Sequence, residues 1–285
     1  MLRCALHCLI ALAALASLGN AALASVVRLH FIAVGHGDVI LIEQDQTALA
    51  MIDAGPPEGA ETILNYLRRG GHHTLAHLFI THTHDDHIGG VPMLLDSMDI
   101  GQIHLTGIIE RREPVELLNQ RLNSGPWVVD TLGAGDIPIQ NSDLKIEVLS
   151  PQKIEAVGRE VDPNSNSLVL LVQHDSVKVL LTADIDQGRE TWLLRRYGAK
   201  LHCQAMKASH HASPSGNGIE FLRVVNPDIV VVSVGPSKWG YPSSETMNRL
   251  YDLCPTVLRT DSVGTVVLQS DGKTIQVLKE RANQE

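Results

Sequence analysis

The sequence predicts an α/β protein in which two sheets pack face to face and helices cover both outer surfaces, a four-layer αββα sandwich. Three observations lead to this fold class. Strand-like segments dominate both ends of the chain, helical segments lie between them, and the 285 residues are 44% hydrophobic, enough for one large domain with a sizeable core. Only 4% of the residues are aromatic, so aliphatic side chains must form most of that core.

The first half of the chain shows short β-branched stretches separated by glycine and proline, and these predict strands. An amphipathic pattern predicts helices between the later strands. Residues 110–136 are harder to interpret, because a helix-like stretch is followed there by a loop with glycine and proline. In order, we expect strands at 26–34, 39–43 and 48–52, a helix at 62–69, a strand at 76–80, a helix at 90–98, a strand at 100–105 and a helix at 114–122.

The second half resumes with strands and then alternates strand and helix. A hairpin is expected over residues 174–176, and the acidic first turn of the following segment favours a helix start. In order, we expect strands at 144–149, 167–173 and 177–181, a helix at 186–197, a strand at 203–207, a helix at 218–225, a strand at 229–234, a helix at 244–253, and strands at 256–259, 265–269 and 274–278.

Residues 1–24 have the composition of an export signal peptide. Arg3 provides a positive charge, residues 8–18 are apolar, and the small-x-small motif at 22–24 is a cleavage site before Ser25. The apolar stretch is shorter than the ~20 residues that a spanning helix needs. We therefore expect a periplasmic or secreted protein without a stable membrane span, whose hydrolase domain covers residues 25–285.

Composition also bears on partners and on the cysteines. The formal net charge is −9, and no long basic run occurs, so the charge does not support nucleic-acid binding. Bound divalent ions would add local positive charge, and a phosphate-bearing substrate therefore stays possible. Cys203 and Cys254 remain after signal removal, either as a disulfide or as two buried free thiols.

Residues 81–90 bring four metal-binding side chains together directly after the apolar run 78–80. His82 and His84 are two apart and share one side of an extended chain, whereas Asp86 and His87 fall at the turn that opens a helix. Imidazole and carboxylate ligands suit zinc, and manganese or iron less specifically. The spacing predicts a centre for two divalent ions.

Two later strands end in further candidate ligands. Asp184 follows the apolar strand 177–181 and can bridge two cations, although it could instead cap the next helix. His210 and His211 follow the strand 203–207. Adjacent histidines point in different directions, so we expect only one of them to bind metal.

These motifs, in this order, resemble those of the metallo-β-lactamase superfamily, and more finely those of the hydrolase domain of ComEC-type competence proteins for DNA uptake. The resemblance extends over nearly all of the predicted mature chain. It rests on the segment 81–90 with supporting segments at 33–38, 52–55, 163–170, 181–184 and 209–213.

The resemblance implies a role for each motif. His82 and His84 would bind one metal ion, Asp86 and His87 the other, and Asp184 would bridge them. His210 would be the next ligand, with His211 as the alternative. Asp53 would orient a ligand histidine, and Asp38 is a weaker case of the same kind. Asn164 and Asn166 would provide neutral oxygen ligands or simply cap a loop.

The chain departs from its relatives at a few positions. His84 stands where ComEC-type domains often carry an aspartate, and Ala212 replaces a glycine. Tyr241 stands where relatives have the histidine of a Gly-His-Pro motif, and it could donate a hydrogen bond to a developing oxyanion. We expect Asp86 to orient the attacking water, and His211, Tyr241 or Lys207 to stabilise charge on the substrate.

The expected chemistry is hydrolysis, because two cations that share a water lower its pKa and polarise the bond under attack. The leading hypothesis is an exported hydrolase that acts on a phosphodiester, either a nucleic acid or a phosphorylated envelope component. One alternative is a β-lactam or lactone hydrolase. The other is a non-catalytic metal-binding envelope protein, which the loss of a histidine at position 241 keeps open.

Overall fold

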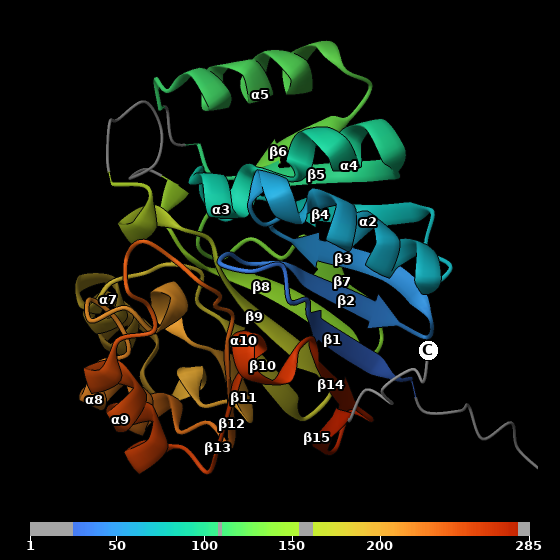
Figure 1. The fold of residues 1–285 in the computed structure, drawn as a ribbon. Coiled ribbons are helices and arrows are strands. Elements are labelled where there is room, and N and C mark those ends of the chain that lie inside the picture. The colour runs from blue at the N-terminus through green and yellow to red at the C-terminus, as the bar shows by residue number, and fades with distance from the viewer. Residues whose placement is uncertain (1–24, 108–109, 154–161, 279–285) are drawn as a thin grey trace, which may run out of the picture.

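The computed structural model describes residues 25–107, 110–153 and 162–278, and within them two mixed sheets pack face to face (Figure 1). The first sheet has eight strands. Their order is β15 (Ile275–Leu278), β14 (Val266–Ser270), β1 (Val27–Phe31), β2 (Ile40–Gln44), β3 (Thr47–Ile52), β4 (Thr74–Phe79), β5 (Asp99–Leu105) and β6 (Val128–Thr131).

The second sheet has seven strands. Their order is β13 (Thr256–Arg259), β12 (Ile229–Val232), β11 (Ala205–Lys207), β10 (Val177–Leu181), β9 (Val169–His174), β8 (Leu144–Ser150) and β7 (Ile139–Gln140). The predicted hairpin between β9 and β10 is confirmed, because Val177 pairs with His174 across a two-residue turn.

Helices cover the outer face of each sheet, which confirms the predicted αββα sandwich (Figure 1). One apolar cluster lies between the sheets. Of the two other clusters, one packs the first sheet against its helices and the other packs the second sheet against its helices. The helices on the first sheet are α2 (Ala60–Arg69), α4 (Val91–Ser97) and α5 (Glu113–Ser124). Those on the second sheet are α7 (Gln187–Tyr197), α8 (Ile219–Val225) and α9 (Ser244–Leu253).

Parallel pairing brings the chemically important loops to one end of the sandwich. β3 and β4 run parallel in the first sheet, and β10 and β11 run parallel in the second. The carboxyl ends of parallel neighbours meet at the same sheet edge, so the loops that follow these four strands lie close together. Asp53, Thr81, Asp184 and Ser209 each occur within three residues of such a strand end.

Some short elements differ from the sequence-based prediction. β6 was not predicted; its four residues are all exposed, so no apolar alternation marks it. β7 has only two residues. Asp86 and His87 lie in a separate short helix, α3 (Asp85–Ile88), and α10 (Thr260–Val263) follows β13. Elements of two to four residues bury too little surface to leave a pattern in sequence.

Two other expectations can be placed against the structure. Cys203 and Cys254 are both buried and form no disulfide among the described residues, so the free-thiol alternative holds. Burial raises the pKa of the Cys203 thiol to about 12. The predicted export signal, 1–24, lies outside the described residues and stays a prediction. None of the described helices has the length and apolar character needed to span a membrane.

A buried carboxylate links β1 and β2 to the end of α2. Glu43 is 7% exposed, and its oxygens lie 3.1 Å from His30 Nε2 and 3.3 Å from His72 Nε2. His30 Nδ1 is 2.8 Å from the hydroxyl of Tyr66 on α2. The hydrogen bond from His30 outweighs the effect of burial and lowers the pKa of Glu43 to about 2.

We expect Glu43→Gln to lower the free energy of unfolding at pH 7 by about 2–3 kcal/mol, because the ionised carboxylate is favoured in the folded state. The depressed pKa contributes stability above the unfolded pKa near 4.5 and loses it as the pH falls toward 2. Denaturant unfolding of both proteins should therefore show a difference that narrows on acidification. A difference independent of pH would contradict this account.

Candidate metal centre

A cleft of about 740 Å³ lies at the end of the sandwich where the strand-end loops meet. Six of the candidate residues line this cleft: His84, Asp86, Asn164, Asp184, His210 and Tyr241. The structure thus gathers residues from separate parts of the sequence around one opening.

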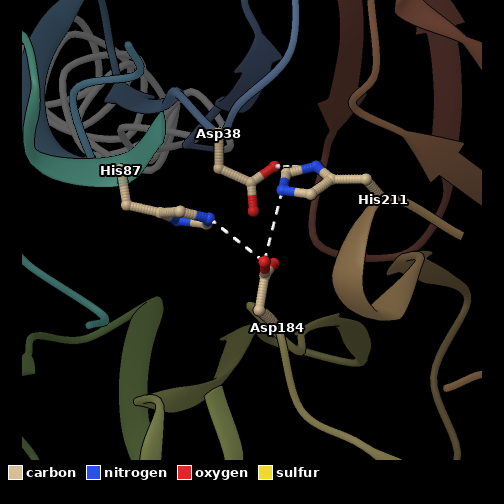
Figure 2. Close-up of side chains that lie close together, drawn as sticks. All are labelled: Asp38, His87, Asp184 and His211. Atoms are coloured by element: carbon tan, nitrogen blue, oxygen red, sulfur yellow. Dashed lines mark ion pairs between the residues drawn. The ribbon is translucent and has the colours of Figure 1, made fainter. Parts of the chain in front are cut away.

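Four buried side chains form the centre of the site (Figure 2). One potential ligand atom from each of Asp38, His87, Asp184 and His211 lies within 4.8 Å of all the others. The Nε2 atoms of His87 and His211 are each 3.3 Å from Asp184 Oδ2. Asp184 therefore lies between two imidazoles, one from the segment after β4 of the first sheet and one from the segment after β11 of the second sheet.

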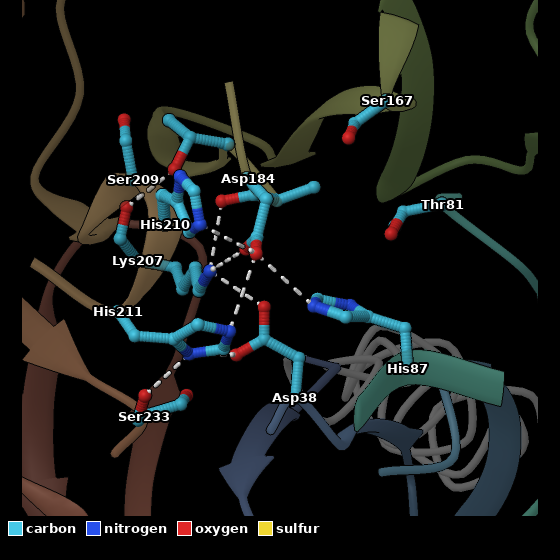
Figure 3. A network of polar contacts seen from close by, with 12 residues as sticks. Asp38, Thr81, His87, Ser167, Asp184, Lys207, Ser209, His210, His211 and Ser233 are labelled. Atoms are coloured by element: carbon cyan, nitrogen blue, oxygen red, sulfur yellow. Dashed lines mark hydrogen bonds and ion pairs between the residues drawn. The ribbon is translucent and has the colours of Figure 1, made fainter. Parts of the chain in front are cut away.

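Each of these two histidines is oriented through its other nitrogen. His87 Nδ1 lies 2.7 Å from Asp53 Oδ2, and Asp53 also accepts hydrogen bonds from the backbone and side chain of Thr81 at 2.7 Å. Asp53 is fully buried and contacts His87 as predicted. His211 Nδ1 donates to the carbonyl oxygen of Ser233 at 2.7 Å (Figure 3). A carbonyl and a carboxylate only accept, so both rings carry a proton at Nδ1, and in their neutral form they can offer an Nε2 lone pair.

These Nε2 atoms test whether the site suits a cation. Both are buried, and neither has a hydrogen-bond partner among the described residues. Although burial opposes protonation, the Asp184 carboxylate raises the pKa of His211 to about 9 and that of His87 well above its usual value. The carboxylates that attract these protons would equally attract a divalent cation, which would also satisfy both nitrogens. The residues fit a metal ion.

The ammonium of Lys207 contacts the carboxylates of Asp38 and Asp184 (Figure 3). Its ammonium lies 2.6 Å from Asp38 Oδ2, 3.2 Å from Asp184 Oδ1 and 2.8 Å from the Ala183 carbonyl, which uses all three donors. The side chain is fully buried. Lys207 was one of three alternatives for stabilising charge on the substrate, and in the structure its ammonium instead contacts two carboxylates and a carbonyl.

His82, His84 and Asp86 surround this centre. His82 is buried, its Nε2 lies 3.1 Å from His84 Nδ1, and its ring centroid is 4.0 Å from that of His87. Burial, followed by the charge of His87, lowers the pKa of His82 well below its usual value, which favours the neutral form that binds metal. Neither His82 nor His84 belongs to the groups of ligand atoms that lie within 4.8 Å of one another in the described chain.

Asp86 belongs to a second close group, with His36 and His211. Its Oδ2 lies 3.3 Å from His211 Nε2 and 3.6 Å from His36 Nε2. Asp86 is about one quarter exposed, so it faces both the buried group and the open cleft. His211 is shared by the two groups and links them.

His210 differs from His211 in its surroundings. His210 Nε2 is 3.7 Å from Asp184 Oδ2, its Nδ1 approaches the hydroxyl of Ser215 at 3.3 Å, and its side chain is partly exposed in the cleft. Its ring meets that of Tyr241 edge on, with centroids 5.4 Å apart. The geometry thus favours His211, the predicted alternative, as the ligand and leaves His210 at the rim.

The two asparagines have separate roles. Asn166 is buried, donates to the Asp162 carbonyl at 3.0 Å and accepts from Arg189 at 3.1 Å, as in the loop-capping alternative. Asn164 lines the cleft, and its Oδ1 has no hydrogen-bond partner among the described residues. Only Asn164 is therefore placed to offer an oxygen to the site.

The sequence-based prediction assigned no role to His36, and it gave Asp38 only as a weaker case of a carboxylate that orients a ligand. Both lie in the loop after β1, far in sequence from the other ligands. A close backbone approach was the available signal: a Cβ on Gly37 would lie 2.4 Å from the Asp86 carbonyl oxygen, so only glycine fits. The close approach of Gly37 to the Asp86 carbonyl brings the loop against α3, and His36 and Asp38 flank Gly37 in the chain.

Together, the fold and the site define a metal-dependent hydrolase. The family model of the metallo-beta-lactamase superfamily matches residues 32–235, and the chain therefore belongs to this superfamily. ComE operon protein 3 of Bacillus subtilis is 25% identical over 210 residues, which are 73% of this chain and 26% of that protein. Competence protein ComA of Neisseria gonorrhoeae is 26% identical over 234 residues, 81% of this chain and 30% of that protein.

A solved structure supports the fold alone. A mutant of the CmlA beta-hydroxylase superposes with a TM-score of 0.56 at 14% identity, over 86% of this chain and 54% of that protein.

The chain spans between a quarter and a third of the length of the two competence proteins that it matches.

We expect Asp53→Ala to weaken zinc affinity by about 10- to 100-fold, because His87 loses the carboxylate that orients its ring. Chelator competition followed by mass spectrometry measures the affinity. Asp53→Asn keeps the volume of the buried side chain and controls for a packing defect, and Asp99→Ala controls for the loss of an exposed carboxylate. Unchanged affinity in both Asp53 variants would show that Asp53 serves the fold only.

Proposed function

We propose that this protein is an exported hydrolase that uses two divalent metal ions, zinc in the first instance, to cleave a phosphodiester. The observation that carries the proposal is the pair of buried Nε2 atoms of His87 and His211, which make no hydrogen bond among the described residues and lie 3.3 Å from the Asp184 carboxylate. Export rests on the sequence of residues 1–24, and Ser25 is the expected first residue of the secreted protein.

The ligands divide into two neighbouring sets. His87, His211 and Asp184, with Asp38 behind them, would hold one ion. His82 and His84, whose ring nitrogens are 3.1 Å apart, would hold the other with a further carboxylate oxygen. Bound divalent ions supply Lewis-acid activation of water and of the phosphate group.

The residues at the rim would act on substrate directly. Asp86 faces the cleft beside His211 and can accept a hydrogen bond from the attacking water, which sets its direction. His210 and Tyr241 lie side by side across the opening and can donate hydrogen bonds to the phosphate oxygens. His210 thereby takes the position of a substrate contact rather than a ligand.

The choice of a phosphodiester rests on the resemblance to the hydrolase domain of competence proteins. When His87 and His211 are neutral, as metal ligands must be, the two neighbouring groups carry the carboxylates of Asp38, Asp86 and Asp184 against the ammonium of Lys207. Two divalent ions would reverse this negative balance, so the loaded site would attract an anionic substrate that the acidic surface alone would repel.

We expect the zinc-loaded protein to hydrolyse bis-p-nitrophenyl phosphate and to lose the activity on chelation. Asp184→Ala should lower kcat by about 100-fold or more, because it removes the oxygen shared by both histidines. Release of p-nitrophenolate measures the rate, and Asp228→Ala, a carboxylate outside the cleft, is the control. Absence of phosphodiester cleavage together with rapid turnover of nitrocefin would replace this proposal with a β-lactamase.

Tyr241→Phe removes one hydroxyl from the rim and keeps the ring against His210. If the hydroxyl stabilises charge in the transition state, kcat should fall about 100-fold with little change in KM or in metal content. The matched control is Tyr251→Phe, on an exposed tyrosine of α9. A change in KM alone would assign Tyr241 to ground-state binding.

A further inference from the structure

A second cavity, of about 470 Å³, opens beside the metal cleft. Residues of α5 line one side of it, and residues of α3 and the start of α4 line the other. Figure 1 shows α5 lying beyond α3 and α4. Its lining is mostly apolar and includes Pro57, Ile88, Pro92, Pro114, Leu117 and Leu118. The volume lies within the range of about 300–1,000 Å³ that is usual for small-molecule sites.

The two cavities are neighbours. Pro57 and Asp85 line both of them, so a molecule seated in the apolar cavity would reach the metal cleft past these residues. Asp85 directly precedes Asp86, which faces His211 at 3.3 Å. The apolar cavity thus adjoins the metal cleft at Pro57 and Asp85.

Packing of α5 does not account for the cavity. α5 packs on the core through Val115, Leu118 and Leu122, whereas Leu117 is directed away from that core and is 57% exposed. Covering Leu117 and the neighbouring apolar lining with a hydrocarbon would remove this surface from water, which is favourable.

Of the charged side chains that line the cavity, Arg121 and Asp85 form ion pairs. Arg121 forms an ion pair with Asp96 of α4, and Arg112 lies 3.1 Å from Asp85. Glu113 adds a negative charge to the lining. These walls would repel a phosphate or a nucleotide, and they suit an uncharged hydrocarbon.

We propose that this cavity binds a hydrocarbon chain of the substrate, so that the phosphodiester cleaved at the metal centre belongs to a lipid-like amphiphile. The proposal rests on the proposed function and selects the envelope-type substrate over the nucleic acid. The chain would lie along Leu117 and Ile88 between α5 and α3, and the polar group would enter the cleft beside Asp85.

A chain-length series tests this inference. For p-nitrophenyl alkyl phosphodiesters with one to eight carbons, used below their aggregation concentration, kcat/KM should rise about fourfold per added methylene until the cavity is full. This equals ~0.8 kcal/mol per buried CH₂. Leu117→Glu should abolish the rise, so that the ratio between octyl and methyl substrates falls toward one.

The control is Val263→Glu, on a residue that is 56% exposed and lies outside the cavity lining. It should keep the full octyl-to-methyl ratio. A wild-type enzyme that cleaves the methyl compound with no dependence on chain length would overturn the inference and leave the proposed function intact.

A binding measurement separates the two proposals further. The metal-free protein should bind 1-octanol more tightly than 1-butanol by about fourfold per methylene, and Leu117→Glu should lose this preference in calorimetry. Equal affinity for both alcohols would overturn the inference even if no phosphodiester were cleaved. Tighter octanol binding without hydrolysis would support the cavity and contradict the proposed function.

Discussion

The rest of the site depends on one constraint, the burial of the Asp184 carboxylate. Its Oδ1 accepts from Lys207, and its Oδ2 lies 3.3 Å from both His87 and His211. A buried carboxylate is tolerated only where positive charge and hydrogen bonds surround it. Lys207 provides a permanent charge on one side, which leaves the other oxygen free for an exchangeable cation. The lysine thereby fixes the carboxylate without occupying the position of the metal.

The backbone around these residues is shaped to the same end. Ala183, His210, His211 and Ala212 all have positive φ, a conformation that non-glycine residues rarely adopt. Such residues persist where the surrounding structure holds them, often at functional sites. Here β10 and β11 each turn sharply at their ends, so that Asp184 and His211 point inward at each other. A glycine in place of Ala212 would adopt this conformation without steric cost.

The sequence predicted the parts of the site that are local and left open those that depend on folding. His82, His84, Asp86 and His87 lie within six consecutive residues, so their spacing alone predicted a metal centre. The choice between His210 and His211 required the left-handed backbone at both residues, which reverses the directions expected of an extended chain. The layers were predictable because long strands alternate with helices. β6 and β7 were not, because exposed or two-residue strands carry no apolar pattern.

The short helix α3 lies between the candidate metal centre and the apolar cavity. This single turn carries Asp86 and His87 toward the buried carboxylates, while Ile88 of the same turn lines the apolar cavity. Consecutive helical residues are rotated by about 100°, so one short helix can present a cleft-facing carboxylate and an apolar wall to different sides. The contact of Gly37 with the Asp86 carbonyl holds this turn against the loop after β1. A shift of α3 would therefore move Asp86, His87 and the Ile88 side of the apolar cavity together.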